Sequence, residues 1–93
     1  MGNNLMISYD LHAPQKNYEK VAKAIKSLGN WAKPHKSFWY VNSRYNAEQA
    51  AEIIWDAMDA DDTVYVVDAS NNDASWFNIK ESTSSFIQKH WGL

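Results

Sequence analysis

The chain alternates β-forming runs with two amphipathic helical runs, and this order limits the folds that are open to it. The β-forming runs, rich in β-branched and aromatic residues, are residues 5–10, 37–42 and 63–68. Residues 17–28 have apolar side chains spaced three and four apart, which predicts a helix. A second, alanine-rich helix opens at Asn46, where Gln49 completes the spacing of a capping box. We expect this helix to stop in the acidic run at 56–62, so the pattern is β-α-β-α-β followed by a tail.

The segment between the first helix and the second β-forming run decides how these elements assemble. From Leu28 to Ser37 the chain is too short to hold another helix. Pro34 allows residues 31–36 to form an edge or bulged strand but not a central one. A hairpin there makes the order β-α-β-β-α-β, that of the ferredoxin-like sandwich, with two helices on one sheet face. We predict this α+β core over residues 1–69; the alternative is a small parallel three-layer sheet.

Residues 70–93 are predicted to form a C-terminal extension that packs on the core or on a partner chain. Within it, residues 75–79 suit a short edge strand or a covering segment, and residues 81–85 suit a polar break. Residues 86–93 suit a terminal helical turn. The apolar side chains that would dock this turn are Phe86, Ile87 and Trp91.

The run at 37–42 is apolar on both of its sides. Alternation places Phe38 and Tyr40 on one face of the sheet and Trp39 and Val41 on the other. Two helices cover only one face, so the other must stay open or be covered by the tail or by a second chain. We therefore predict a homodimer.

Composition excludes several classes of protein. A chain of 93 residues forms one domain, and the absence of cysteine excludes disulfides, thiolate metal sites and thiol nucleophiles. No apolar run approaches the roughly 20 residues needed to cross a bilayer. The first residues lack the basic-then-apolar order of a secretory signal, so we expect a cytoplasmic protein without a membrane partner. The net charge of −2 does not indicate a nucleic-acid binder.

Several short segments together resemble a known family. In order, they are ISYDL at 7–11, a lysine-rich helix before Gly29, SFWYV at 37–41, the alanine-rich helix, and DADD with TVYVVDA at 59–69. This order resembles the small CRISPR-associated protein two (Cas-two) of the spacer-acquisition complex and its VapD-type toxin relatives. With SYDLH and the later GNW, the chain looks closest to the small SinR-like proteins.

The resemblance implies a ferredoxin-like homodimer whose two sheets face each other across a two-fold axis. It also implies that Asp10 is the catalytic position, and that Asp10 from both chains can hold Mg²⁺ for phosphodiester hydrolysis. Ser37 falls where the family often has a serine before an aromatic residue. The family often carries arginines after the first strand, whereas this chain has His12 and Lys16, which weakens the nuclease and DNA-binding expectations.

The candidate catalytic residues each have a simpler structural role as an alternative. Asp10 is the candidate metal ligand, because Mg²⁺ is held by one or two carboxylates with water and phosphate. Its alternative role is to cap the following loop. His12 is a candidate general base or phosphate contact, or else a solvated loop residue. Ser37 has no activating base that the sequence reveals.

Candidate binding residues for RNA, DNA or a small nucleotide are mostly lysines. Because they also suit a solvated surface, and Arg44 is the single arginine, a dedicated duplex-DNA reader is disfavoured. Trp31, Trp76 and Trp91 lie outside the predicted core and suit either base stacking or, by preference, a dimer interface. The full binding set is Lys16, Lys20, Lys23, Lys33, Lys36, Arg44 and Trp31.

Three functions follow from these observations. The first is a non-catalytic or weakly active interaction dimer, a scaffold in nucleic-acid-related antiviral defence. The second is a Mg²⁺-dependent endoribonuclease or deoxyribonuclease that uses Asp10 of both chains. The third is a nucleotide-sequestering protein of a phage or of a host defence system.

Overall fold

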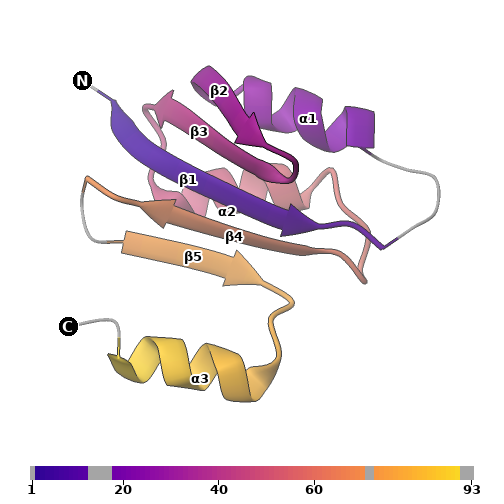
Figure 1. The fold of residues 1–93 in the computed structure, drawn as a ribbon, viewed down its shortest axis with the longest axis vertical. Helices are drawn as coiled ribbons and strands as arrows, with labels where there is room; N and C mark the ends of the chain where they lie inside the picture. Colours follow the sequence, from indigo (N-terminus) through magenta and orange to yellow (C-terminus); the bar gives the residue numbers. More distant parts are fainter. Residues whose placement is uncertain (1, 13–17, 71–72, 91–93) are drawn as a thin grey trace.

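The structure, a computed structural model, describes residues 2–12, 18–70 and 73–90. In these ranges it is an α+β domain with one five-stranded antiparallel sheet and three helices (Figure 1). The elements are β1 (Asn3–Asp10), α1 (Tyr18–Lys26), β2 (Gly29–His35), β3 (Phe38–Ser43), α2 (Ala47–Trp55), β4 (Thr63–Asp68), β5 (Asp73–Phe77) and α3 (Glu81–His90).

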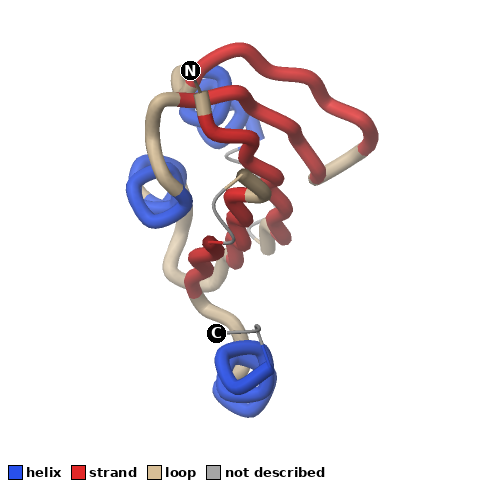
Figure 2. The backbone as a smooth tube through the Cα atoms, turned by 90° about the vertical axis from the view of Figure 1, so that its left-hand side faces the viewer, coloured by secondary structure: helices blue, strands red, loops and turns tan. Residues whose placement is uncertain are grey.

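The sheet has the strand order β2-β3-β1-β4-β5, and every neighbouring pair is antiparallel. The helices α1 and α2 lie on the same face of it (Figure 2). This arrangement is compatible with the predicted ferredoxin-like sandwich and excludes the parallel three-layer sheet. The predicted hairpin between β2 and β3 is present, with β2 as an edge strand.

The hydrophobic core lies between the sheet and the two helices. Each strand contributes alternate side chains, because successive residues point to opposite faces. The alanines of α2 are fully buried and let this helix approach the sheet closely. The largest fully buried apolar side chains are Leu5, Ile7, Val21, Ile25, Trp39, Val41, Ile54, Val64 and Val66.

The predicted capping box at the start of α2 is confirmed. The Gln49 backbone N–H donates to Asn46 Oδ1 (2.8 Å), and the Asn46 N–H donates to Gln49 Oε1 (3.0 Å). The helix ends at Trp55, before the acidic run, as expected. One member of that run is buried: the Asp62 carboxylate accepts hydrogen bonds from the backbone N–H groups of Asp59 (2.9 Å) and His12 (2.8 Å). Asp62 therefore ties the end of β1 to the loop after α2.

The β2–β3 hairpin contains two backbone constraints. Gly29 begins β2, and a Cβ there would lie 2.1 Å from the Asn42 carbonyl oxygen, so only glycine fits. Lys36 and Ser37 form the turn, with Ser37 at φ 60° in the left-handed region. The register shifts between Ala32 and His35, as in a β-bulge, and this irregular edge strand accommodates Pro34.

The C-terminal extension differs from the prediction in two respects. Its edge strand, β5, pairs with β4 and begins at Asp73, earlier than the short edge strand predicted within residues 75–79. The polar residues 81–85 form the first half of α3 rather than a break, and the Ser84 N–H donates to the Lys80 carbonyl (2.9 Å) in its first turn. Phe86 is 54% exposed, and its predicted docking on the core or on a partner chain stays a prediction. The Ile87 side chain and Trp91 lie outside the described residues.

Helix α3 lies beyond β5, away from α1 and α2 (Figures 1 and 2). The Trp76 indole N–H donates to Ser84 Oγ (2.9 Å) and connects this helix to the sheet. One face of the sheet is therefore covered by α1 and α2, and no helix of the described residues is stacked on the opposite face (Figure 2). We call this second side the uncovered face.

Candidate interaction surface on the uncovered sheet face

The uncovered face presents apolar and aromatic side chains from four strands. The strand register aligns Met6 with Tyr40 and Val67, and Ser8 with Phe38 and Tyr65. All of these side chains are half-buried except Ser8, which is exposed. The central residues of this face on β1, β3, β4 and β5 are, by register, Met6, Ser8, Phe38, Tyr40, Tyr65, Val67, Ala74 and Trp76.

Two stacked aromatic pairs lie in one row across this face. His35 stacks on Phe38 with ring centroids 4.9 Å apart, and Tyr65 stacks on Trp76 at 5.0 Å, each at an interplanar angle of 14°. Ser8 lies between the two pairs in the register. Neighbouring strands are about 4.8 Å apart, which is close to the distance between stacked aromatic rings. One more ring could therefore stack above Ser8, between the rings of Phe38 and Tyr65. We call these four rings the ring row.

Polar groups surround this aromatic centre, which itself carries no carboxylate or ammonium. Burial raises the pKa of the Tyr65 phenol above its ordinary value, so this phenol is neutral at physiological pH. At one end, the Tyr40 hydroxyl donates to Asn4 Oδ1 (2.7 Å), which Asn42 Nδ2 also approaches (3.4 Å). At the other end of β1 lies Asp10. An apolar centre within a polar rim is the usual anatomy of a protein–protein interface.

Asp10 is on the uncovered face, with its side chain 73% exposed. His12 Nε2 lies 3.4 Å from Asp10 Oδ2, so the structure brings these two predicted catalytic residues together. Residues 2–12, 18–70 and 73–90 contain no group of three or more His, Asp or Glu side chains arranged to hold a metal. Asp10 is the one carboxylate at this position, so a second carboxylate for Mg²⁺ would have to come from a partner chain, with water and phosphate as the other ligands.

Ser37 does not join Asp10 and His12 in a catalytic arrangement. Its carbonyl oxygen accepts a hydrogen bond from the Tyr9 N–H (3.2 Å), which places the hairpin turn beside the end of β1. Within the described ranges, no base contacts its hydroxyl. The structure accordingly gives Ser37 a turn position and no means of activating it as a nucleophile.

The predicted nucleic-acid-binding residues do not converge on one surface. Arg44 stacks over the Tyr45 ring (5.2 Å) at the end of β3, and Lys33 and Lys36 are at the hairpin. Trp31 is 46% exposed, and the Lys26 ammonium lies 4.7 Å from the centre of its ring. Lys16 lies outside the described residues. The set is thus divided among α1, the hairpin and the opposite end of β3.

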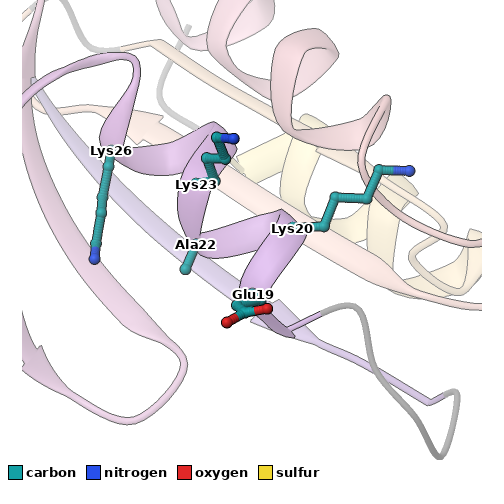
Figure 3. Close-up of a pocket in the computed structure, with 5 residues that line it drawn as sticks. All are labelled: Glu19, Lys20, Ala22, Lys23 and Lys26. Atoms are coloured by element: carbon teal, nitrogen blue, oxygen red, sulfur yellow. The ribbon is translucent and has the colours of Figure 1, made fainter.

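The lysines of α1 line a broad surface hollow of about 600 Å³. Figure 3 shows that Lys20 and Lys26 point in different directions, with Glu19 near the start of the helix. Diverging side chains on an exposed helix do not make a shared binding site. Lys20 and Lys26 therefore do not converge on one ligand, and a solvated face stays the alternative role of the lysines of this helix.

The tryptophans divide between the two faces. Trp39 is buried in the core, where its indole N–H donates to the Tyr9 hydroxyl (3.2 Å). Trp55 packs at the edge of the core, stacked on Phe77 at 5.1 Å. Trp39 is therefore a core residue, and Trp55 is partly buried against the core. Trp76 belongs to the ring row, which local sequence does not reveal because the pairing of β5 with β4 brings Trp76 beside Tyr65.

Comparison of the chain with protein-family models, with curated proteins and with solved structures gives no match. The resemblance to the Cas-two-like proteins therefore stays a prediction. In the described part of the chain, no helix has the length and apolar character needed to span a membrane. The observations that bear on function are therefore those of the structure itself, above all the composition of the uncovered face.

Proposed function

We propose that this protein is a homodimeric interaction protein, a scaffold with little or no catalytic activity, in which the uncovered faces of two copies pack together. The observation that carries the proposal is the uncharged aromatic centre of this face. Tyr, Trp, Phe and Met are the residues enriched where protein interfaces are most buried, and charged residues are depleted there. A surface with this composition is stabilised when a second surface removes it from water.

A second copy is the partner that these observations favour. A polynucleotide owes much of its affinity to lysine and arginine contacts with phosphates, and the centre of this face offers none. A two-fold axis would pair the face with itself, so apolar centre would meet apolar centre and polar rim would meet polar rim. The predicted face-to-face arrangement of the Cas-two-like proteins agrees with this packing.

Light scattering and sedimentation at micromolar concentration test the dimer. Met6→Lys places an ammonium in the centre of the uncovered face, and we expect it to convert the dimer into a folded monomer. Glu52→Lys is the control, because it makes an acidic-to-basic change on the exposed side of α2. A monomeric parent protein, or a Met6→Lys variant that stays dimeric, contradicts the proposal.

A Mg²⁺-dependent nuclease is a second candidate, favoured by the position of Asp10. Asp10 lies on the proposed interface side, so a two-fold axis near the end of β1 would bring two carboxylates together. The nuclease predicts divalent-metal-dependent cleavage of RNA or DNA that Asp10→Asn abolishes while the dimer persists. The nuclease candidate is contradicted if cleavage survives Asp10→Asn, or if no cleavage occurs at any Mg²⁺ or Mn²⁺ concentration. The non-catalytic scaffold is then the favoured function.

Nucleotide sequestration is a third candidate, favoured by the open position above Ser8. A base placed there would stack between Phe38 and Tyr65, and each such contact contributes about 1–3 kcal/mol. Titration with a panel of nucleotides, followed by Trp76-dependent fluorescence, tests this candidate. Ser8→Trp would fill the position and abolish binding. Binding that persists in Ser8→Trp counts against it.

A further inference from the structure

A small hollow lies on the helix-covered side of the molecule, apart from the uncovered face. It has a volume of about 260 Å³ and lies where the end of β1, the start of α1 and the β2–β3 hairpin meet. This is below the roughly 300–1,000 Å³ of sites for drug-sized ligands, so it suits one compact chemical group. Its lining residues are Tyr9, Tyr18, Lys33, Lys36 and Ser37.

Tyr9 lines this hollow and carries a buried hydroxyl group. Its side chain is only 8% exposed, and its hydroxyl oxygen accepts the Trp39 indole N–H (3.2 Å). A phenol has a single proton, and the indole has no lone pair to accept it. Among residues 2–12, 18–70 and 73–90, none accepts the Tyr9 proton. A buried donor in this state is stabilised by an acceptor that enters from outside.

The charge of the hollow is positive. Lys33 and Lys36 contribute two ammonium groups, and no carboxylate is among the described residues that line it. Within the described ranges neither lysine forms an ion pair; the Lys33 ammonium instead lies 5.1 Å from the centre of the Trp39 ring. Ser37 adds a hydroxyl at the left-handed turn position. Strained backbone of this kind persists more often where a binding site requires it.

We propose that this hollow binds a phosphoryl group. The phenol of Tyr9 and the two ammonium groups present donors and positive charge, which match the negative, acceptor-only oxygens of a phosphate. The site does not depend on the dimer, because its residues lie on the opposite side of the sheet from the ring row. The phosphoryl group can belong to a free phosphate monoester or to the backbone of a single nucleic-acid strand.

Isothermal titration calorimetry tests the site with inorganic phosphate, AMP and a short single-stranded RNA as probes. Lys36→Gln removes one ammonium, and we expect it to weaken binding about tenfold, in line with the loss of one charge-assisted hydrogen bond. Lys20→Gln is the matched control, because it removes the same charge from α1 outside the hollow. Tyr9→Phe removes the buried donor and keeps the ring, and circular dichroism verifies that it folds.

The results separate a site from diffuse attraction. Saturable binding of phosphate and AMP that Lys36→Gln weakens and Lys20→Gln does not supports the site for a monoester. The same pattern with RNA alone supports the site for a strand backbone. Equal weakening by both glutamine variants, or no saturable binding of any probe, overturns the proposal. Light scattering on the same samples reports the dimer separately, so failure of one proposal is distinguishable from failure of the other.

Discussion

The two faces of the sheet are built from the same strands but have different chemistry. The covered face carries aliphatic side chains such as Leu5, Ile7 and Val66, all fully buried beneath α1 and α2. The uncovered face carries rings with polar atoms, half-buried and aligned across the strands. The covered face therefore supplies the hydrophobic core, whereas the uncovered face is the surface on which the proposed dimer depends.

The largest expected contrast comes from two adjacent residues of β1. Ile7→Ala leaves a cavity in the core, and we expect it to lower the free energy of unfolding by about 2–5 kcal/mol. Met6→Ala trims the uncovered face and should cost about 1 kcal/mol or less in the monomer. Urea denaturation measures both. Equal losses would mean that the two faces are not distinct in the way described.

Substitution of Asp62 tests whether the stability of the fold also depends on the hydrogen bonds of this buried carboxylate. Asp62→Ala leaves two backbone N–H groups without their charged acceptor, and we expect a loss of about 2–3 kcal/mol. Its exposed neighbour gives the control, because Asp61→Ala should change stability by less than about 0.5 kcal/mol. If thermal denaturation shows similar effects for the two, the buried carboxylate is not a structural tie.

Two stacked pairs, one on each face, separate folding from association. Phe77→Leu breaks the stack with Trp55 and should lower the free energy of unfolding by about 1 kcal/mol while the dimer persists. Tyr65→Leu breaks the stack with Trp76 and should shift the monomer–dimer equilibrium strongly towards monomer. Analytical ultracentrifugation of both variants measures the fraction of dimer. A dimer lost in Phe77→Leu but kept in Tyr65→Leu would place the interface on the covered face instead.

The phenol of Tyr65 predicts an alkaline limit to association. Burial raises its pKa above the ordinary 10.0, so the folded state prefers the neutral phenol. The corresponding stability is present below pH 10 and is lost as pH rises through the folded pKa. We expect the dimer to dissociate in that range less readily in Tyr65→Phe than in the parent. Light scattering across the titration checks this, and identical profiles would remove Tyr65 from the interface.

The smallest expected effect concerns the two left-handed residues. Ser37→Gly relieves the backbone at φ 60° and should raise the free energy of unfolding by up to about 1 kcal/mol. Asn78 also has positive φ, but its side chain donates to the carbonyls of Ala60 and Asp62. Asn78→Gly should therefore destabilise. Thermal melting of both variants gives the comparison, and a destabilised Ser37→Gly would show that its hydroxyl matters more than the strain.

Local patterns in the sequence were enough to predict the helices, strands and hairpin that form the covered face of the sheet. Apolar spacing located α1 and α2, alternation separated Trp39 from Tyr40, and the short linker with Pro34 indicated the hairpin. The ring row was not predictable in this way, because it depends on which strands pair. Trp76 lies beside Tyr65 only because of the register in which β5 pairs with β4. No pattern in the sequence around either residue indicates this register.

The same limit applies to the polar contacts. Asp62 looked like one member of an acidic run, since nothing in its neighbourhood shows that the loop folds back on His12. The phosphoryl hollow unites Tyr9 with Lys36 through the hairpin turn, across a long separation in sequence. The lysines were singled out one by one, but their grouping and the buried phenol below them follow only from tertiary structure.

The irregular β2 edge limits how large an assembly of this protein can become. Pro34 has no N–H to donate, and the bulge between Ala32 and His35 bends the strand away from regular pairing. An incoming chain consequently finds a poor template along this border, and strand-by-strand growth into fibrils is blocked there. If two copies associate, their contact is therefore disfavoured along β2.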